Sequence, residues 1–483
     1  MGFHLLTVLW GDAYVRATQE ILWSSLLAPE NLPALANLDQ CVYIVYTRPA
    51  EARKLEACPL WAELKSYLRC EIRIMDDFDP AFFSDIDPDL RYRVLGSYQA
   101  NMVNEARRHG QGLVSLNADF LCSAGSLPGL QKLVKQGYRC VLVPGIRLVL
   151  ESALDEINHR YRQQDGKIRI TSRETVELAI RNQHPITQIL HWETDCASKC
   201  PDWLLWPVGE EGFVMRSLAV HPFYTHPRHE VGAETSLDSG NYLFRAHPDP
   251  KDIYVVTDSD EMTFFSLDAV THGDQVKPER PRRFSPSEVA LFARQHLSPH
   301  HLLFSKRVVR LHSRDLSESW RAAEASSEKA MQSVRECLRW APWLQLYRLC
   351  QDRAVFLPRT ALRAALAPLA LIAGLTVVLR RFRIGSLLLK LYLLVCPRSC
   401  QEESILYRCA RMLLRTPHFK LSSQIAERLL DSNFAWKARL LLGEIAYWQE
   451  GDKNKARLTF EQLLRQRPPE MDKAESYLKL LQN

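Results

Sequence analysis

A short apolar strand that ends directly in a polar turn is the feature that most constrains this chain. The run Leu113-Val114-Ser115-Leu116 is typical of a buried β-strand, and Asn117-Ala118-Asp119 follows it without a break. In open α/β sheets, ligands bind in the crevice at the carboxyl ends of the strands. Asp119 is therefore predicted to face a binding crevice. The alternative is a strand-terminal Asp that caps the following turn.

Three earlier strands show the same alternation of strand and helix. Strands are predicted at 3–10, 42–46 and 71–75, and each precedes a segment with apolar residues at helical spacing. Strands that alternate with helices predict an α/β fold with a mostly parallel, mixed sheet flanked by helices. The helical pattern after residue 400 adds an all-α C-terminal region.

The order of these elements resembles that of GT-A glycosyltransferases, in the nucleotide-diphospho-sugar transferase superfamily. Residues 113–120 are similar to the family's strand that ends in a DxD motif, and residues 123–136 match the helix after it. The resemblance covers residues 1–270. It implies a glycosyltransferase that moves a sugar from a nucleotide-sugar donor to an acceptor.

In that family, Mn²⁺ or Mg²⁺ neutralises the diphosphate leaving group, and the resemblance makes Asp119 its ligand. Asn117 stands where the motif has its first acid, which removes one charge and weakens metal binding. The resemblance also assigns donor contacts to residues near strand ends. These residues are Trp10, Gly11, Tyr14, Asp76, Asn117 and Asp119.

The resemblance places the acceptor side between the strand near 214–220 and residue 241. It implies His221 as a metal ligand and Asp238 as the catalytic base of an inverting reaction. His-Pro pairs recur at residues 184, 221, 226 and 247, so a turn is the alternative role of His221.

A literal DxD sequence occurs later, as Asp258-Ser259-Asp260, and Glu261 follows it. These acids are secondary metal candidates. They would equally suit a helix N-terminus, where carboxylates accept hydrogen bonds from free backbone N–H groups. Together with His221 they would form the centre of a metal-dependent hydrolase, an alternative to the transferase.

Residues 353–400 are both the most basic and the most apolar part of the chain. They hold eight Lys or Arg and no Asp or Glu, so the rest of this chain of net charge +6 is nearly neutral. Their uncharged runs are shorter than the roughly 20 residues of a spanning helix. They predict contact with an anionic membrane surface, or else a buried helical pair. The segment is too apolar to predict nucleic-acid binding.

The last segment resembles tetratricopeptide repeats, on the residues Gly451, Ala456 and Phe460. This resemblance implies a surface for a protein partner. An inactive GT-A-like scaffold that acts through these helices is a further alternative, which Asn117 favours. The expected domains are a GT-A-like domain (1–270), a helical connector (271–352), the basic apolar segment (353–400) and the repeat-like helices (401–483).

The N-terminus lacks the basic region of a secretory signal and leads directly into a strand. The twelve cysteines are scattered, several of them inside apolar strands and helices, as free buried thiols are. Both features predict a cytoplasmic protein, with residues 353–400 at the inner face of the membrane.

Overall fold

The computed structural model describes residues 2–75, 88–232, 237, 242–273, 282–351, 388–389, 392, 403–414, 419–431, 434–465, 474–475, 477–478 and 481. The chain forms two compact units. Unit 1 consists of residues 1–76 and 94–338, and unit 2 of residues 77–93 and 339–483.

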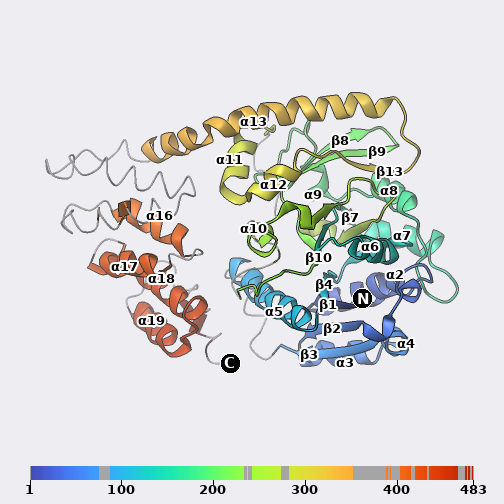
Figure 1. Cartoon of the computed structure of the whole chain (residues 1–483), viewed down its shortest axis with the longest axis horizontal. Helices are drawn as coiled ribbons and strands as arrows, with labels where there is room; N and C mark the ends of the chain where they lie inside the picture. Colours follow the sequence, from blue (N-terminus) through green and yellow to red (C-terminus); the bar gives the residue numbers. More distant parts are fainter. Residues whose placement is uncertain are drawn as a thin grey trace. The chain divides into compact units, whose positions relative to one another are not determined.

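Unit 1 is built on a seven-stranded mixed sheet flanked by helices, which confirms the predicted fold class (Figure 1). The strand order is β11-β6-β10-β4-β1-β2-β3. Strand β10 is antiparallel to both of its neighbours, and the other neighbouring strands are parallel. The strands are β1 (Phe3–Val8), β2 (Val42–Thr47), β3 (Arg69–Ile74), β4 (Gly112–Ser115), β6 (Cys140–Leu142), β10 (Pro222–Thr225) and β11 (Ile253–Val255).

Two three-stranded sheets complete the β-structure of the described residues. One has the order β5-β12-β7, with β5 (Phe120–Cys122), β7 (Arg147–Val149) and β12 (Phe264–Asp268). The other has the order β13-β9-β8, with β8 (Trp203–Val208), β9 (Gly212–Ser217) and β13 (Val309–His312). Strand β5 follows β4 after only four residues, so the first of these sheets begins at the edge of the main sheet.

The helices that lie wholly or partly in unit 1 alternate with these strands. Residues 12–26 form one helical segment, α1 (Asp12–Ala17), a π-helix (Thr18–Trp23) and α2 (Ser24–Leu26). The helical pattern at 50–68 is divided at Pro59, because proline suits the first turn of a helix and not its interior. The other helices are α3 (Pro49–Glu56), α4 (Pro59–Tyr67), α5 (Pro88–Arg108), α6 (Ser126–Lys135), α7 (Leu150–Arg160), α8 (Ser172–Arg181), α9 (Pro185–Gln188), α10 (Tyr242–Ala246), α11 (Pro286–His296), α12 (Pro299–Phe304) and α13 (Ser319–Gln351).

Successive residues of the central strands enter different cores. Leu5 of β1 and Tyr43 of β2 pack with Trp23 and Trp61 of the helical segments on one face. Their chain neighbours Leu6 and Ile44 pack with Met102 and Val103 of α5 on the other. A parallel sheet covered on both faces needs such continuous apolar runs.

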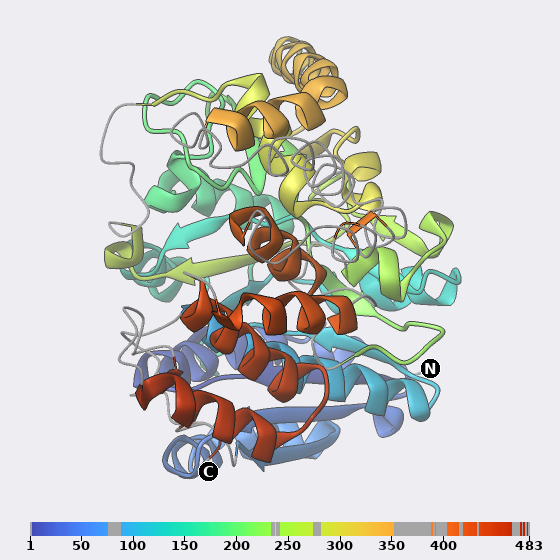
Figure 2. The ribbon, with the colours of Figure 1, turned by 90° about the vertical axis from the view of Figure 1, so that its left-hand side faces the viewer.

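Unit 2 is a set of helices, drawn in red in Figure 2. They are α16 (Glu403–Leu413), α17 (Phe419–Arg428), α18 (Ala435–Trp448) and α19 (Lys453–Arg465). A Cβ on Gly443 of α18 would lie 2.3 Å from the ring of Phe460, so α18 and α19 approach closely at this point. Glu444 is fully buried, and its carboxylate accepts a 2.5 Å hydrogen bond from Arg411. The repeat-like assignment of these helices stays a prediction.

Among the helices of the described residues, none is long and apolar enough to cross a membrane. The basic apolar segment 353–400 lies outside the described residues, apart from 388, 389 and 392.

The buried His247 makes unit 1 sensitive to acid. Its Nε2 atom lies 2.8 Å from Oγ1 of Thr225, and burial lowers the pKa of His247 to about 3. The unfolded chain therefore takes up a proton that the folded chain resists, and stability is lost as the pH falls below about 6.5. Between about pH 8 and pH 5 we expect His247 alone to cost about 2 kcal/mol of unfolding free energy. Urea unfolding of wild type and His247→Gln at both pH values measures this.

The variant separates the effect of His247 from that of other histidines with a lowered pKa, such as His226, whose pKa is about 4. Between about pH 8 and about pH 5, His247→Gln should therefore lose about 2 kcal/mol less unfolding free energy than wild type. An equal loss in both proteins would contradict the assignment.

Candidate functional site

The strand order reverses between β1 and β4. From β1 the chain proceeds outward to β2 and β3, and it then returns to place β4 on the opposite side of β1. In an open α/β sheet, ligands bind outside the carboxyl ends of the strands at such a switch point. The segments that border it are residues 9–11 after β1 and residues 116–119 after β4.

Three of the predicted donor-binding residues lie in or beside the first segment. Gly11 has φ +85°, and there is open space where its Cβ would be. Its backbone N–H donates a 3.2 Å hydrogen bond to Oε1 of the buried Glu51. Trp10 is half-buried, and 41% of Tyr14 is exposed, so neither belongs to the core. The predicted donor residue Asp76 and the predicted base Asp238 lie outside the described residues.

Asn117 and Asp119 lie in the second segment, between β4 and β5. Asn117 is exposed, and Asp119 is half-buried. The carbonyl oxygen of Asp119 accepts a 3.0 Å hydrogen bond from the backbone N–H of Leu267 in β12, which holds the turn in place. Burial of the carboxylate raises the pKa of Asp119 to about 6, although the nearby Arg147 opposes this change. An acid with a raised pKa is common at functional sites.

Arg147, Asp268 and His272 lie close enough to influence Asp119 electrostatically. Asp268 accepts a 2.6 Å hydrogen bond from Nη1 of Arg147 and a 2.5 Å hydrogen bond from Nδ1 of His272. Burial alone would raise the pKa of Asp268, but the hydrogen bond from His272 and the charge of Arg147 hold it below its usual range. We call Asp119, Arg147, Asp268 and His272 the β4 cluster.

Of the residues around Asp119, one could have been predicted from the sequence. Asp268 is the last residue of β12, so the rule that singled out Asp119, an acid at a strand end, applies to it equally. Arg147 carries no such signal. Only the parallel pairing of β7 with β12 brings it beside Asp268.

His221 lies immediately before β10 and is exposed. Because Tyr224 of the antiparallel β10 pairs with Val114 of β4, His221 lies at the same edge of the sheet as Asn117. Within the described part of the chain, neither His221 nor Asp119 belongs to a group of three side chains whose ligand atoms could share one metal ion.

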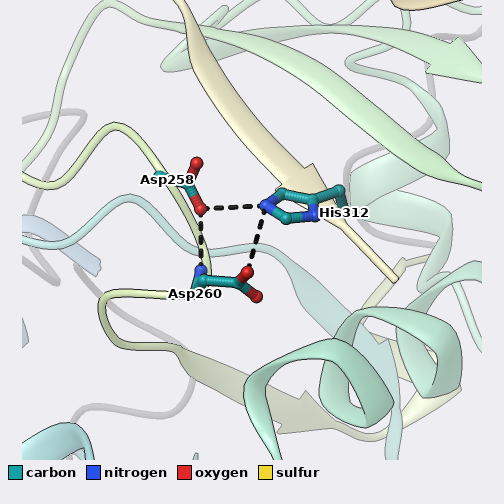
Figure 3. A group of neighbouring side chains, drawn as sticks. All are labelled: Asp258, Asp260 and His312. Carbon is teal, nitrogen blue, oxygen red and sulfur yellow. Dashed lines mark hydrogen bonds and ion pairs between the residues drawn. The ribbon is translucent and has the colours of Figure 1, made fainter. Parts of the chain in front are cut away.

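Asp258 and Asp260 come together with His312, as Figure 3 shows. We call these three residues the Asp258 cluster. Nε2 of His312 lies 2.9 Å from Oδ1 of Asp258 and 3.9 Å from Oδ2 of Asp260. One ligand atom from each residue lies within 4.8 Å of the others. This is an arrangement that could hold a metal ion.

The acids of the Asp258 cluster lie in a turn between β11 and β12. The alternative that they begin a helix is therefore wrong, because the chain pairs with β13 at Asp258 and then enters β12. Glu261 accepts a 2.7 Å hydrogen bond from the hydroxyl of Tyr254 instead of joining the cluster. His312 was not recognisable from the sequence, since it stands 54 residues after Asp258.

The two clusters are separate sites at one edge of the sheet. Strands β10 and β6 lie between β4 and β11. Three strand spacings correspond to about 14 Å. Among the described residues, the group of side chains that could share one ion contains Asp258, Asp260 and His312 and no member of the β4 cluster.

A cavity of about 560 Å³ lies elsewhere, beside strand β8 and the beginning of α13. Trp206, Glu211 and Arg314 contribute to its lining, which contains none of the residues predicted to act on a donor.

No family model and no curated protein matches this chain. Among solved structures, it is similar to mouse xyloside xylosyltransferase 1 in its apo form, at 12% sequence identity with a TM-score of 0.20. The match covers 34% of this chain and 60% of the xylosyltransferase chain, less than two thirds of its length. A likeness of this extent carries no argument about family or activity.

Proposed function

We propose that this protein is a glycosyltransferase that binds a nucleotide-sugar donor at the switch point between β1 and β4. The observation that carries the proposal is Asp119, a carboxylate with its pKa raised to about 6 in the segment that follows the central strand β4. Gly11, in the segment that follows β1, has open space where any other residue would have a side chain.

The β4 cluster suits the charge that develops in sugar transfer. The bond from the sugar's anomeric carbon to the diphosphate breaks, and the diphosphate leaves with both electrons. The acceptor oxygen bonds to that carbon and gives its proton to a base, the role predicted for Asp238. Groups that neutralise the leaving oxygens favour this reaction. Arg147 has 41% of its side chain exposed and could pair with a donor phosphate as well as with Asp268. Asp119 would hold Mn²⁺ or Mg²⁺, which would supply further positive charge.

Asn117 favours a second reading, in which the switch point no longer supports catalysis. Its exposed amide oxygen is a weaker ligand than a carboxylate. An inactive scaffold would act through the helices of unit 2. It would bind a protein and no nucleotide.

Calorimetric titration of UDP, GDP and CMP, each with and without Mn²⁺, tests the proposal. We expect micromolar binding of one nucleotide, weakened roughly 100-fold in Asp119→Ala, because the contact to the diphosphate or its ion is lost. Asp155→Ala is the matched control, since Asp155 is an exposed acid on α7.

Equal binding by Asp119→Ala would remove Asp119 from the site. If none of the three nucleotides binds under either condition, the transferase proposal fails and the scaffold is favoured. A bound nucleotide identifies the set of donor sugars for turnover assays.

A further inference from the structure

We propose that the Asp258 cluster is a second, independent site that binds one divalent transition-metal ion, with Mn²⁺ and Zn²⁺ as suitable probes. The site does not depend on the proposed transferase activity. Three strand spacings, about 14 Å, separate β4 from β11, the strands that precede the two clusters.

The distances within the cluster fit a common ion. Ligand atoms that lie about 2.1 Å from a metal are about 3.0 Å apart at a right angle and at most about 4.2 Å apart. Nε2 of His312 lies 2.9 Å from Oδ1 of Asp258, close to the right-angle value, and 3.9 Å from Oδ2 of Asp260, below the upper limit. All three ligand atoms lie within 4.8 Å of one another, so small side-chain movements would bring them to one ion.

The hydrogen bonds of His312 orient its ring for a cation. Nδ1 lies 2.8 Å from the carbonyl oxygen of Arg314, which can only accept, so Nδ1 carries a proton. Nε2 then faces the carboxylate of Asp258, which also accepts. Nε2 and Oδ1 of Asp258 therefore point at each other, as two ligand atoms of one ion would. A backbone carbonyl on Nδ1 is a usual partner of metal-binding histidines.

His312 is held rigidly in this position. It is 3% exposed, and its backbone N–H donates a 3.0 Å hydrogen bond to Oγ of Ser259, the residue between the two acids. The backbone N–H of Ser259 donates in turn to the carbonyl oxygen of Arg310, next but one to His312. Strand β13 and the turn after β11 are therefore fixed together before any ion binds.

The surroundings leave negative charge for an ion to neutralise. Arg173 is bonded to both Asp260 and Asp315, each at 2.8 Å. With Asp258, these acids carry three negative charges, and Arg173 opposes them with one positive charge. Arg310, which pairs with Asp258 through its backbone, directs its side chain to Glu324. A divalent cation would offset negative charge here, and the 41%-exposed Arg173 can withdraw from Asp260.

The ligand atoms indicate the class of ion. Imidazole nitrogen favours Zn²⁺ and similar ions, and carboxylate oxygen favours Mn²⁺, Mg²⁺ and Ca²⁺. A site with one imidazole nitrogen and two carboxylate oxygens therefore suits divalent ions that bind both kinds of ligand, such as Mn²⁺ and Zn²⁺. A bound ion would join the turn after β11, at the edge of the main sheet, to β13 of another sheet.

The full chain, freed of metal with a chelator, is titrated with Mn²⁺ and separately with Zn²⁺ in the absence of nucleotide. We expect one ion bound at this site, with affinity at least tenfold lower in Asp258→Asn and in His312→Gln. Asp119→Ala should retain it, which separates this site from the donor site. Glu261→Gln, an acid of the same turn bonded to Tyr254, is the matched control and should bind as the wild type does.

Arg173→Ala provides a test that does not remove a ligand. It frees Asp260 and should strengthen metal binding several-fold, whereas a purely structural ion-pair network predicts no metal binding in either protein.

Isotopic labelling of histidine, read by electron paramagnetic resonance of bound Mn²⁺, should show a nitrogen ligand that His312→Gln lacks. The inference is overturned if wild type binds no ion, or if Asp258→Asn and His312→Gln bind as tightly as wild type.

Discussion

Replacing Asp119 with asparagine is expected to make unit 1 more stable and donor turnover at least roughly 100-fold slower. The pKa of Asp119 is raised from 3.8 to about 6. The carboxyl group of Asp119 therefore ionises more easily in the unfolded chain than in the folded one. The resulting loss of unfolding free energy is fully present above about pH 6 and absent below about pH 3.8. At about pH 8 it amounts to at most about 3 kcal/mol, which the neutral amide of asparagine avoids.

Urea unfolding at about pH 8 and about pH 4, together with a nucleotide-sugar turnover assay, measures both effects. Asp268→Asn is the control, because the pKa of Asp268 is lowered and its carboxylate stabilises the fold above its unfolded pKa. That variant should lose stability at about pH 8. If Asp119 only caps the turn after β4, Asp119→Asn should instead lose stability and leave turnover unchanged, which would contradict our proposal.

Gly212→Ala, at the start of β9, is expected to cause a large loss of unfolding free energy. Gly212 has φ +146°, and a Cβ there would lie 1.9 Å from the carbonyl oxygen of Leu311 in the neighbouring β13. Backbone cannot yield as a flexible side chain does. The two strands must separate at the pair formed by Gly212 and His312. We expect a loss of about 3 kcal/mol or more of unfolding free energy.

Gly209→Ala, in the turn that joins β8 to β9, is the matched control. Gly209 also has a positive φ, +51°, but nothing lies within 4 Å of the place where its Cβ would be. Only backbone strain is added there, about 1 kcal/mol. Chemical unfolding of both variants compares the two costs. Equal losses would show that close approach to Leu311 is unimportant.

Much of the main sheet follows from local sequence. The runs at 3–10, 42–46, 71–75 and 113–116 became β1 to β4 within a few residues of the predicted ends. Buried parallel strands need continuous apolar residues, and the polar residues that end them are easily seen. The position of Asp119 at the carboxyl edge depends only on this local signal.

The lateral order of the strands could not be inferred in the same way. Strand β10 inserts antiparallel between β4 and β6, which precede it by many residues. That insertion decides how far Asp258 lies from Asp119. His312 was missed for a related reason: it reaches Asp258 because Arg310 of β13 pairs with Asp258, and no local pattern encodes that pairing.

The insertion of β10 also bears on how the protein is made. When β4 and β6 have left the ribosome, the strand that must join them is still roughly 80 residues away. At 5–20 residues per second, this is a wait of roughly 4 to 16 s. During that interval, the edges of β4 and β6 that later pair with β10 lack this partner, and unpaired edges are prone to wrong pairing. The growing chain would therefore benefit from a chaperone until residue 225 emerges, and synonymous codons that slow translation between β6 and β10 should lower the yield of soluble protein.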